Sequence, residues 1–166
     1  MLHMDDLVEQ YGDALFGLCR KLTQNRHDAE DLYQQTFLAA MGKQFRKDGN
    51  PKALLTSICI AQWKNEERKR ARRHRIAPEI TADIPLHSAE NPEEEAFRRQ
   101  QQENVRSIVA ALDEKFRLPV LLYYSMDLSL SEIAHALHCP EGTVKSRLYA
   151  AREKIKQELE VMGYDR

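Results

Sequence analysis

Residues 128–155 read LSLSEIAHALHCPEGTVKSRLYAAREKI, and this stretch predicts two helices joined by a tight turn. Both parts place apolar residues at helical spacing: Leu130, Ile133, Ala134 and Leu137 in the first, and Val144, Leu148, Ala151 and Ile155 in the second. Cys139-Pro140 marks the break, because proline lacks an amide hydrogen and restricts the residue before it. This is the pattern of a helix-turn-helix motif, whose second helix lies in the DNA major groove.

The second predicted helix carries polar groups on the side away from its apolar stripe. They are Thr143, Lys145, Ser146 and Arg147 near its start, and Tyr149, Arg152 and Lys154 further along. Arg and Lys pair with guanine edges or phosphates, and Ser and Thr reach either. A solvated helix that only packs a C-terminal core can have the same basic outer face, so both interpretations stay open at this point.

Three strings in this region resemble the promoter-reading C-terminal domain of bacterial sigma factors of the sigma-70 family, most of all the small extracytoplasmic-function (ECF, group 4) members. They are LDEKFRLPVLLYY at 112–124, LSEIA at 130–134 and EGTVKSRL at 141–148. The resemblance implies contacts with −35 promoter DNA at Glu141, Thr143, Lys145, Ser146, Arg147, Tyr149 and Arg152. Where the family usually has Gly in the turn, this chain has His138, which tolerates positive φ at some strain.

Charge is strongly segregated along the 166 residues, although the net charge is only −1. Residues 41–75 carry a net charge of +8, and residues 76–97 carry −6 with no Lys or Arg. Clustered positive charge of this kind favours nucleic-acid binding even in a nearly neutral protein. The length suits one large domain or two small ones.

Residues 28–42, DAEDLYQQTFLAAMG, predict a helix that Asp28 caps. The segment resembles the core-polymerase-binding helix of the sigma family, Asp-Ala-Glu-Asp-Leu-x-Gln-Glu-Thr-Phe, with Gln35 where Glu is usual. The resemblance implies polymerase contacts at Asp28, Asp31, Gln34, Gln35 and Phe37. A solvated polar face is the alternative, and Phe37 can instead belong to the core.

Residues 43–75 predict a turn at Asp48-Gly49-Asn50, after which Pro51 suits a helix start. The predicted helix runs from Lys52 to about Arg75 and is apolar first and very basic later. The position matches the sigma segment that recognises and melts −10 DNA, although Ala53, Ala61 and Asn65 depart from the family pattern. Positive charge beside an aromatic suits single-stranded DNA. The expected −10 contacts are Asp48, Asn50, Trp63, Lys64, Arg68, Lys69, Arg70, Arg72 and Arg73. For Trp63 alone, a place in the core is the stronger interpretation.

Residues 76–97 predict an acidic linker, interrupted by Pro78, Pro85 and Pro92. In the sigma family this linker runs near the polymerase active site, where an acidic strand could mimic nascent RNA. A plain solvated tether fits the sequence equally well.

The chain shows no Gly-rich phosphate loop, His-Glu-x-x-His or Gly-x-Ser-x-Gly motif, so we expect no enzyme and no cofactor. Cys19, Cys59 and Cys139 lack zinc spacing, so we expect no metal and a buried apolar role for each. No apolar run is long enough for a transmembrane helix, and the N-terminus lacks a signal segment. We therefore expect a cytoplasmic protein with no membrane insertion.

Together these features predict an all-α protein with two small helical domains, residues 1–75 and 98–166, joined by the flexible acidic linker. The resemblance implies a sigma factor with three partners: core RNA polymerase (β′ and β subunits), promoter DNA and an anti-sigma factor. Two alternatives remain. One is a stand-alone helix-turn-helix regulator, although no dimer heptad is visible; the other is a non-initiating protein that sequesters polymerase or an anti-sigma factor.

Overall fold

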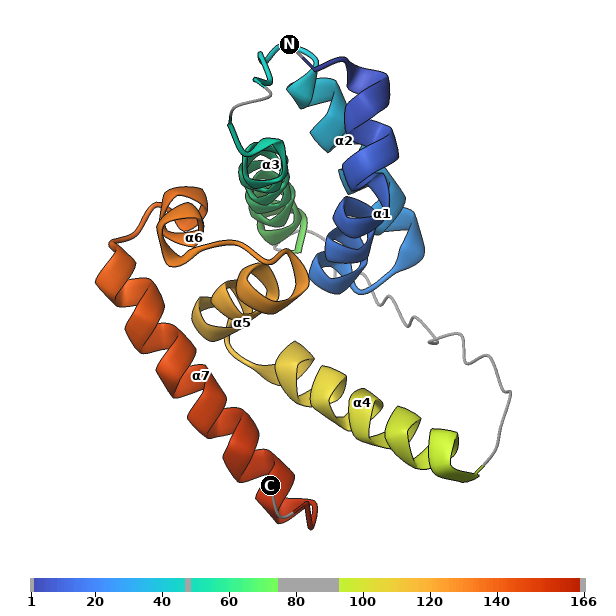
Figure 1. The fold of residues 1–166 in the computed structure, drawn as a ribbon, viewed down its shortest axis with the longest axis vertical. Coiled ribbons are helices and arrows are strands. Elements are labelled where there is room, and N and C mark those ends of the chain that lie inside the picture. The colour runs from blue at the N-terminus through green and yellow to red at the C-terminus, as the bar shows by residue number, and fades with distance from the viewer. Residues whose placement is uncertain (1, 47–48, 75–92, 165–166) are drawn as a thin grey trace.

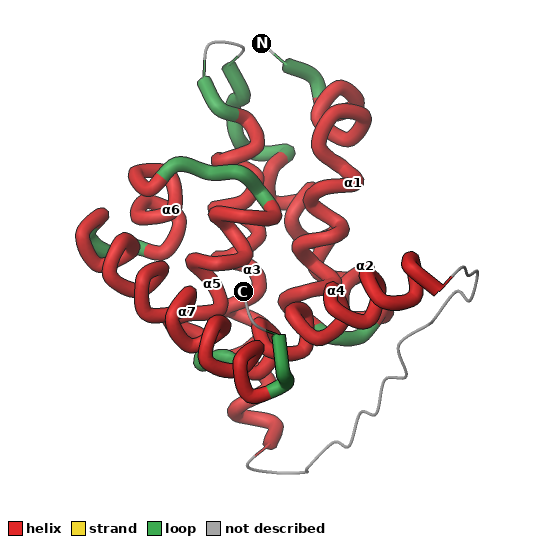
Figure 2. The backbone as a smooth tube through the Cα atoms, turned by 60° about the horizontal axis from the view of Figure 1, so that its bottom comes forward, coloured by secondary structure: helices red, strands yellow, loops and turns green. Residues whose placement is uncertain are grey.

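The computed structural model describes residues 2–46, 49–74 and 93–164. In these ranges the chain forms helices and loops and has no strand, which confirms the predicted all-α class (Figures 1 and 2). The helices are α1 (Met4–Thr23), α2 (Arg26–Ala40), α3 (Pro51–His74), α4 (Glu93–Ala111), α5 (Glu114–Val120), the π-helical turn η1 (Leu121–Ser125), α6 (Leu130–Leu137) and α7 (Glu141–Val161). We call α1–α3 the N-terminal half and α4–α7 the C-terminal half. Most of the predicted linker lies outside the described residues, and its last part, 93–97, begins α4.

Asn25, and not Asp28, caps α2, so the predicted start of this helix was wrong by one turn. The Asn25 side chain accepts a hydrogen bond from the Asp28 backbone N–H at 2.8 Å. It also donates to the Asp28 carboxylate at 2.6 Å. Asn and Asp are about equally good caps, so residue type could not decide between them.

Asn50 and Pro51 begin α3 as the turn chemistry predicted. The Asn50 side-chain oxygen accepts a hydrogen bond from the Ala53 backbone N–H at 3.1 Å, and Pro51 is the first helical residue. The first half of α3 is the buried half, with Leu55, Ile58, Cys59, Ile60 and Trp63 in the core. The basic second half of α3 is therefore held in place by the buried first half.

The helix-turn-helix is formed by α6 and α7 as predicted. Ser129 and Glu132 make a reciprocal capping box at the start of α6. His138 ends α6 in the left-handed conformation, with φ 54° and ψ 48°, so the turn forms without the usual glycine. On α7, Val144, Leu148 and Ala151 are buried, which leaves its opposite face exposed.

Pro119 lies inside α5, and the helix widens into η1 directly after it. Because proline has no N–H, it cannot make the usual hydrogen bond to the preceding turn, and the wider turn begins two residues after it. The Leu121 N–H is shared between the carbonyls of Arg117 and Leu118. This local adjustment sets the positions of Tyr124 and Ser125 at the end of η1.

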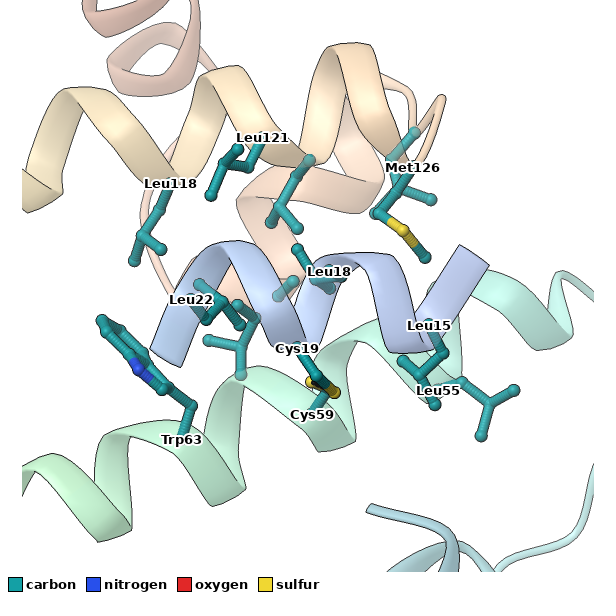
Figure 3. Close-up of a cluster of buried hydrophobic side chains, with 14 of the residues drawn as sticks. Leu15, Leu18, Cys19, Leu22, Leu55, Cys59, Trp63, Leu118, Leu121 and Met126 are labelled. Atoms are coloured by element: carbon teal, nitrogen blue, oxygen red, sulfur yellow. Dashed lines mark hydrogen bonds between the residues drawn. The ribbon is translucent and has the colours of Figure 1, made fainter. Parts of the chain in front are cut away.

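The two halves share one hydrophobic core, which the sequence did not predict. In Figure 3, α1 lies between α3 and the C-terminal half, with Leu18 and Leu22 close to Leu118 and Leu121. Helix α3 also contacts α6, and α1 contacts η1. The N-terminal and C-terminal halves are therefore packed together in this structure.

Cys19 and Cys59 lie side by side in this core, as expected for small buried residues. Their sulfur atoms are 3.7 Å apart, and both side chains are fully buried. The hydrogen bond to Cys59, and then burial, raise the pKa of the Cys19 thiol. A buried neutral thiol is chemically inert, so the pair serves packing between α1 and α3. Cys139 is half-buried in the turn of the helix-turn-helix.

Candidate polymerase- and DNA-facing surfaces

The outer face of α2 presents three of the five predicted polymerase-binding residues. Asp31, Gln34 and Gln35 are exposed. Phe37 is only 9% exposed and packs edge-on against the ring of Tyr33, with the ring centroids 4.9 Å apart. The structure therefore places Phe37 in the core, where it supports the helix from inside.

Asp28 points towards α3 and not along the exposed face of α2. Its carboxylate accepts a hydrogen bond from Arg70 and forms an ion pair with it. Burial by itself would raise the pKa of Asp28, but the bonds from Arg70 and Asn25, together with the Arg70 charge, lower it. This pair ties α2 to α3, so Asp28 and Arg70 each have a partner within the protein, and their polymerase and DNA contacts stay predictions.

Leu38 and Met41 extend the exposed face of α2, and the residues predicted from the sequence did not include them. They are 60% and 67% exposed. Asp31, Gln34, Leu38 and Met41 follow each other at three- and four-residue steps, which places them on one stripe of the helix. The signal was present in the sequence, because Ala29, Leu32, Thr36, Phe37 and Ala40 already supply a complete buried face.

The predicted −10 residues divide into two groups along α3. Lys64 is half-buried, and Arg68, Lys69, Arg72 and Arg73 are exposed on the second half of the helix. Lys69 lies 3.6 Å from the Glu66 carboxylate. This exposed basic group is the part of α3 that fits phosphate contacts.

Asn50 and Trp63, two further predicted −10 residues, contact the C-terminal half. The Asn50 side chain donates a hydrogen bond to the Glu132 carboxylate. Trp63 is 3% exposed, and the guanidinium carbon of Arg117 lies 5.7 Å from its ring centroid. The interpretation of Trp63 as a core residue is thus confirmed. Asp48 falls outside the described residues.

Glu132 belongs to the first helix of the helix-turn-helix, so its hydrogen bond with Asn50 links that motif to the start of α3. Burial by itself would raise the pKa of Glu132, but hydrogen bonds from Ser129 and Asn50, together with the charge of Lys52, lower it. The carboxylate is therefore held in its charged form between α6 and the start of α3.

In the first turns of α7, the predicted −35 residues face away from the buried side of the helix-turn-helix. Glu141, Lys145, Ser146 and Tyr149 are exposed, and Thr143 and Arg147 are half-buried. Arg152 is engaged within the protein, because its Nε donates to the Tyr124 hydroxyl at 2.7 Å and its guanidinium also lies near the Tyr123 ring. Arg152 therefore links η1 to α7 while it remains exposed, and its −35 contact stays a prediction.

A groove of about 1070 Å³ opens where α4, α7 and η1 meet the ends of α1 and α2. Val105, Val109, Leu121, Ile155 and Leu159 give it an apolar lining. Its charged residues are almost all basic: Arg20, Lys21, Arg26, Arg106, Arg117, Arg152 and Lys156, against Glu160 alone. Partial burial, and then the charge of Arg106, lower the pKa of Lys21. The groove thus has an apolar lining, and the charged side chains around it are mostly positive.

Within residues 2–46, 49–74 and 93–164, no helix is long and apolar enough to cross a membrane. Over the same residues, no group of three or more His, Cys, Asp or Glu side chains could hold a metal ion.

Two family models match the chain, one in the N-terminal half and one in the C-terminal half. Sigma-70 region 2 matches residues 7–73, and Sigma-70, region 4 matches residues 102–155. RNA polymerase sigma-H factor of Pseudomonas aeruginosa is 31% identical, over 94% of this chain and 86% of that protein. ECF RNA polymerase sigma factor SigW of Bacillus subtilis is 28% identical, over 93% of this chain and 87% of that protein.

A solved structure shares the fold of this chain. The sigma factor RpoE of Bartonella quintana, solved in complex with the anti-sigma factor NepR, superposes with a TM-score of 0.79 at 24% identity, covering 95% of this chain and 96% of that one. The chain belongs to the sigma-70 family, in its extracytoplasmic-function group. It is a sigma factor, a protein that binds core RNA polymerase and directs promoter-specific transcription initiation.

Proposed function

We propose that residues 1–75 bind core polymerase and −10 DNA, and that residues 98–166 read the −35 element. The observation that carries this assignment is the exposed start of α7, where Lys145, Ser146 and Tyr149 stand on a helix whose inner face is buried. A recognition helix needs this combination of a fixed inner face and free polar groups at its N-terminal end.

On the polymerase side, the exposed stripe of α2 supplies the contact surface. Asp31, Gln34 and Gln35 offer charge and hydrogen-bonding groups, and Leu38 and Met41 offer apolar anchors. Interfaces gain most of their affinity from a few desolvated residues inside a polar rim. Because both halves bind the same polymerase, each DNA contact can be weak by itself.

We further propose that an anti-sigma factor binds in the groove between α4 and α7. The apolar lining fits the hydrophobic stripe of an amphipathic helix, and the surrounding Arg and Lys fit an acidic partner. The protein would act in the cytoplasm, have no catalytic activity and need no cofactor, because the polymerase performs the chemistry.

The double variant Lys145→Ala/Arg147→Ala tests the −35 assignment. We expect it to bind core polymerase as the wild type does and to lose promoter-specific initiation by at least tenfold, since each good base contact is worth about 1–3 kcal/mol. Lys156→Ala removes a positive charge from a later turn of the same helix and serves as the control. Equal initiation by the double variant and the control would overturn the assignment.

A further inference from the structure

Arg152 lies on the same exposed stripe of α7 as two of the proposed −35 residues. Lys145, Tyr149 and Arg152 follow each other at steps of four and three residues, and all three are exposed. The stripe therefore runs from the first turns of the helix, which carry the base-reading candidates, towards its middle. Arg152 is the last of the predicted −35 residues along it.

The position of Arg152 along α7 indicates which part of the DNA it can reach. A helix rises about 1.5 Å per residue, so Arg152 lies about 16 Å beyond Glu141 along the axis. The major groove is about 12 Å wide and about 8.5 Å deep, and a recognition helix contacts base edges with its N-terminal residues. A side chain this far along the helix therefore lies at the rim of the groove, at the level of the phosphates.

Two tyrosines of η1 hold the Arg152 side chain. The Nε of Arg152 donates a hydrogen bond to the Tyr124 hydroxyl at 2.7 Å. The guanidinium carbon lies 5.5 Å from the ring centroid of Tyr123 and 5.7 Å from that of Tyr124. The two rings meet edge to face, with their centroids 4.9 Å apart. Together these contacts limit the orientations that the guanidinium can adopt.

The wide turn of η1 brings these tyrosines to α7. It continues α5, which lies beside α7 (Figure 1). Leu121 and Leu122 remain buried in this turn, whereas Tyr124 is 59% exposed and reaches Arg152 from outside the core. Single π-turns of this kind are frequent at functional sites, because they redirect side chains that a regular helix would place elsewhere.

The positive charge of Arg152 is available for a ligand. No carboxylate within residues 2–46, 49–74 and 93–164 forms an ion pair with it. Because Nε makes the bond to Tyr124, the two terminal amino groups of the guanidinium can form the paired hydrogen bonds that phosphate oxygens accept. An arginine that is already held in place also loses less conformational freedom when it binds.

We propose that Tyr124 is a positioning residue for −35 binding, whose hydroxyl and ring hold Arg152 against a backbone phosphate at the rim of the major groove. Tyr124 is not among the residues predicted to contact −35 DNA. This role rests on the function proposed above, because it requires α7 to be the recognition helix. Since a phosphate carries no sequence information, Tyr124 acts on affinity and not on the choice of base.

The salt dependence of promoter binding tests this role. The full chain is combined with core polymerase, and its affinity for a promoter duplex that gives protein-dependent starts is measured over a series of KCl concentrations. Arg152→Ala should lower the slope of log K against log salt by about 0.9, the value for one phosphate contact. Tyr124→Phe keeps the ring and removes only the hydroxyl, and should weaken binding roughly three- to tenfold with a smaller loss of slope. Both variants should select the same −35 motif as the wild type.

A double-mutant cycle separates positioning from an independent contact. Tyr124→Phe should have no further effect in a chain that already carries Arg152→Ala, because its role acts through Arg152. Arg98→Ala removes one exposed positive charge at the start of α4 and should leave the slope unchanged. Thermal unfolding of each variant completes the test, since a merely structural role would lower the unfolding temperature without changing the salt slope.

Three results would overturn the positioning role. The first is a Tyr124→Phe variant that binds with wild-type affinity and slope while Arg152→Ala binds more weakly. The second is an additive loss in the double variant, and the third is a relaxed −35 motif in Arg152→Ala, which would indicate a base contact. If the wild-type protein forms no promoter complex with core polymerase, the proposed function has failed, and the role of Tyr124 fails with it.

Discussion

The guanidinium carbon of Arg117 lies 5.7 Å from the ring centroid of Trp63, and this contact joins α5 to α3 across the two halves of the chain. The geometry is that of a cation–π pair. It places a residue of the proposed −10 segment in the core and gives it a partner in the other half.

Replacement of Trp63 should distinguish its packing role from any role of its N–H group. We expect Trp63→Ala to lower the free energy of unfolding by about 3–5 kcal/mol, because it leaves a large cavity. Trp63→Phe should cost only about 1 kcal/mol, because no hydrogen bond to the indole N–H is lost. Urea titrations followed by circular dichroism measure both values, and equal losses would contradict this account.

The Asn50–Glu132 bond predicts a pH-dependent effect of the substitution Asn50→Asp. Aspartate still caps α3, but at pH 7 it meets the charged Glu132. The lowered pKa of Glu132 means that its stabilising contribution is present above 4.5, its ordinary value, and is lost as the pH falls through the folded-state pKa. The loss of stability, about 1 kcal/mol at pH 7, should therefore shrink as the pH falls below about 4.5.

The double variant Asn50→Asp/Glu132→Gln provides the control for that prediction. Glutamine keeps the capping box with Ser129 and can donate to an aspartate carboxylate. At pH 7 it should restore most of the stability that Asn50→Asp removes. Additive losses in the double variant would show that the two side chains do not interact.

Asp28 and Asp31 lie one turn apart on α2 and should behave differently. Asp28→Ala breaks the pair with Arg70 and the link to Asn25, and should destabilise the protein by about 1–2 kcal/mol. Asp31→Ala should change stability by less than about 0.5 kcal/mol and weaken binding to core polymerase. Thermal unfolding and a core-binding titration, carried out on both variants, would detect a reversal of these roles.

Leu38 and Met41 should matter for binding and not for folding. We expect Leu38→Ser and Met41→Ser each to weaken core polymerase binding by roughly tenfold, with unfolding free energies within about 0.5 kcal/mol of the wild type. Val8→Ser, at an apolar position of α1 that is 41% exposed, is the matched control. Unchanged affinity in both α2 variants would remove the apolar half of the proposed stripe.

Local structure could be predicted from the sequence because short-range chemistry determines it. The apolar spacing and Pro140 were enough to locate α6 and α7, and positive φ at His138 followed from its place in the turn. Asn50 and Pro51 gave the start of α3 for the same reason. The cap of α2 was missed because Asn25 and Asp28 suit that position about equally well.

Packing between the halves could not be predicted, because helical spacing does not reveal which partner a buried face meets. Leu18 and Leu22 have the same periodicity whether they face their own half or Leu118 and Leu121. For the same reason, the sequence could not show which of the predicted site residues are free to contact a partner. Phe37 carries a side chain that suits an interface, and only its contact with Tyr33 shows that it packs in the core. Arg152 stays exposed, and only the structure shows that it bonds to Tyr124.

The central claim is that this chain directs core RNA polymerase to promoters through two separate DNA-reading surfaces. The most direct test mixes the purified protein with core polymerase and a library of promoter-sized duplexes, and sequences the 5′ ends of the transcripts. We predict starts that depend on the protein and share two enriched motifs, near −35 and −10, with Lys145→Ala relaxing only the −35 motif. Core binding without protein-dependent starts, or starts with no shared upstream motif, would contradict the claim.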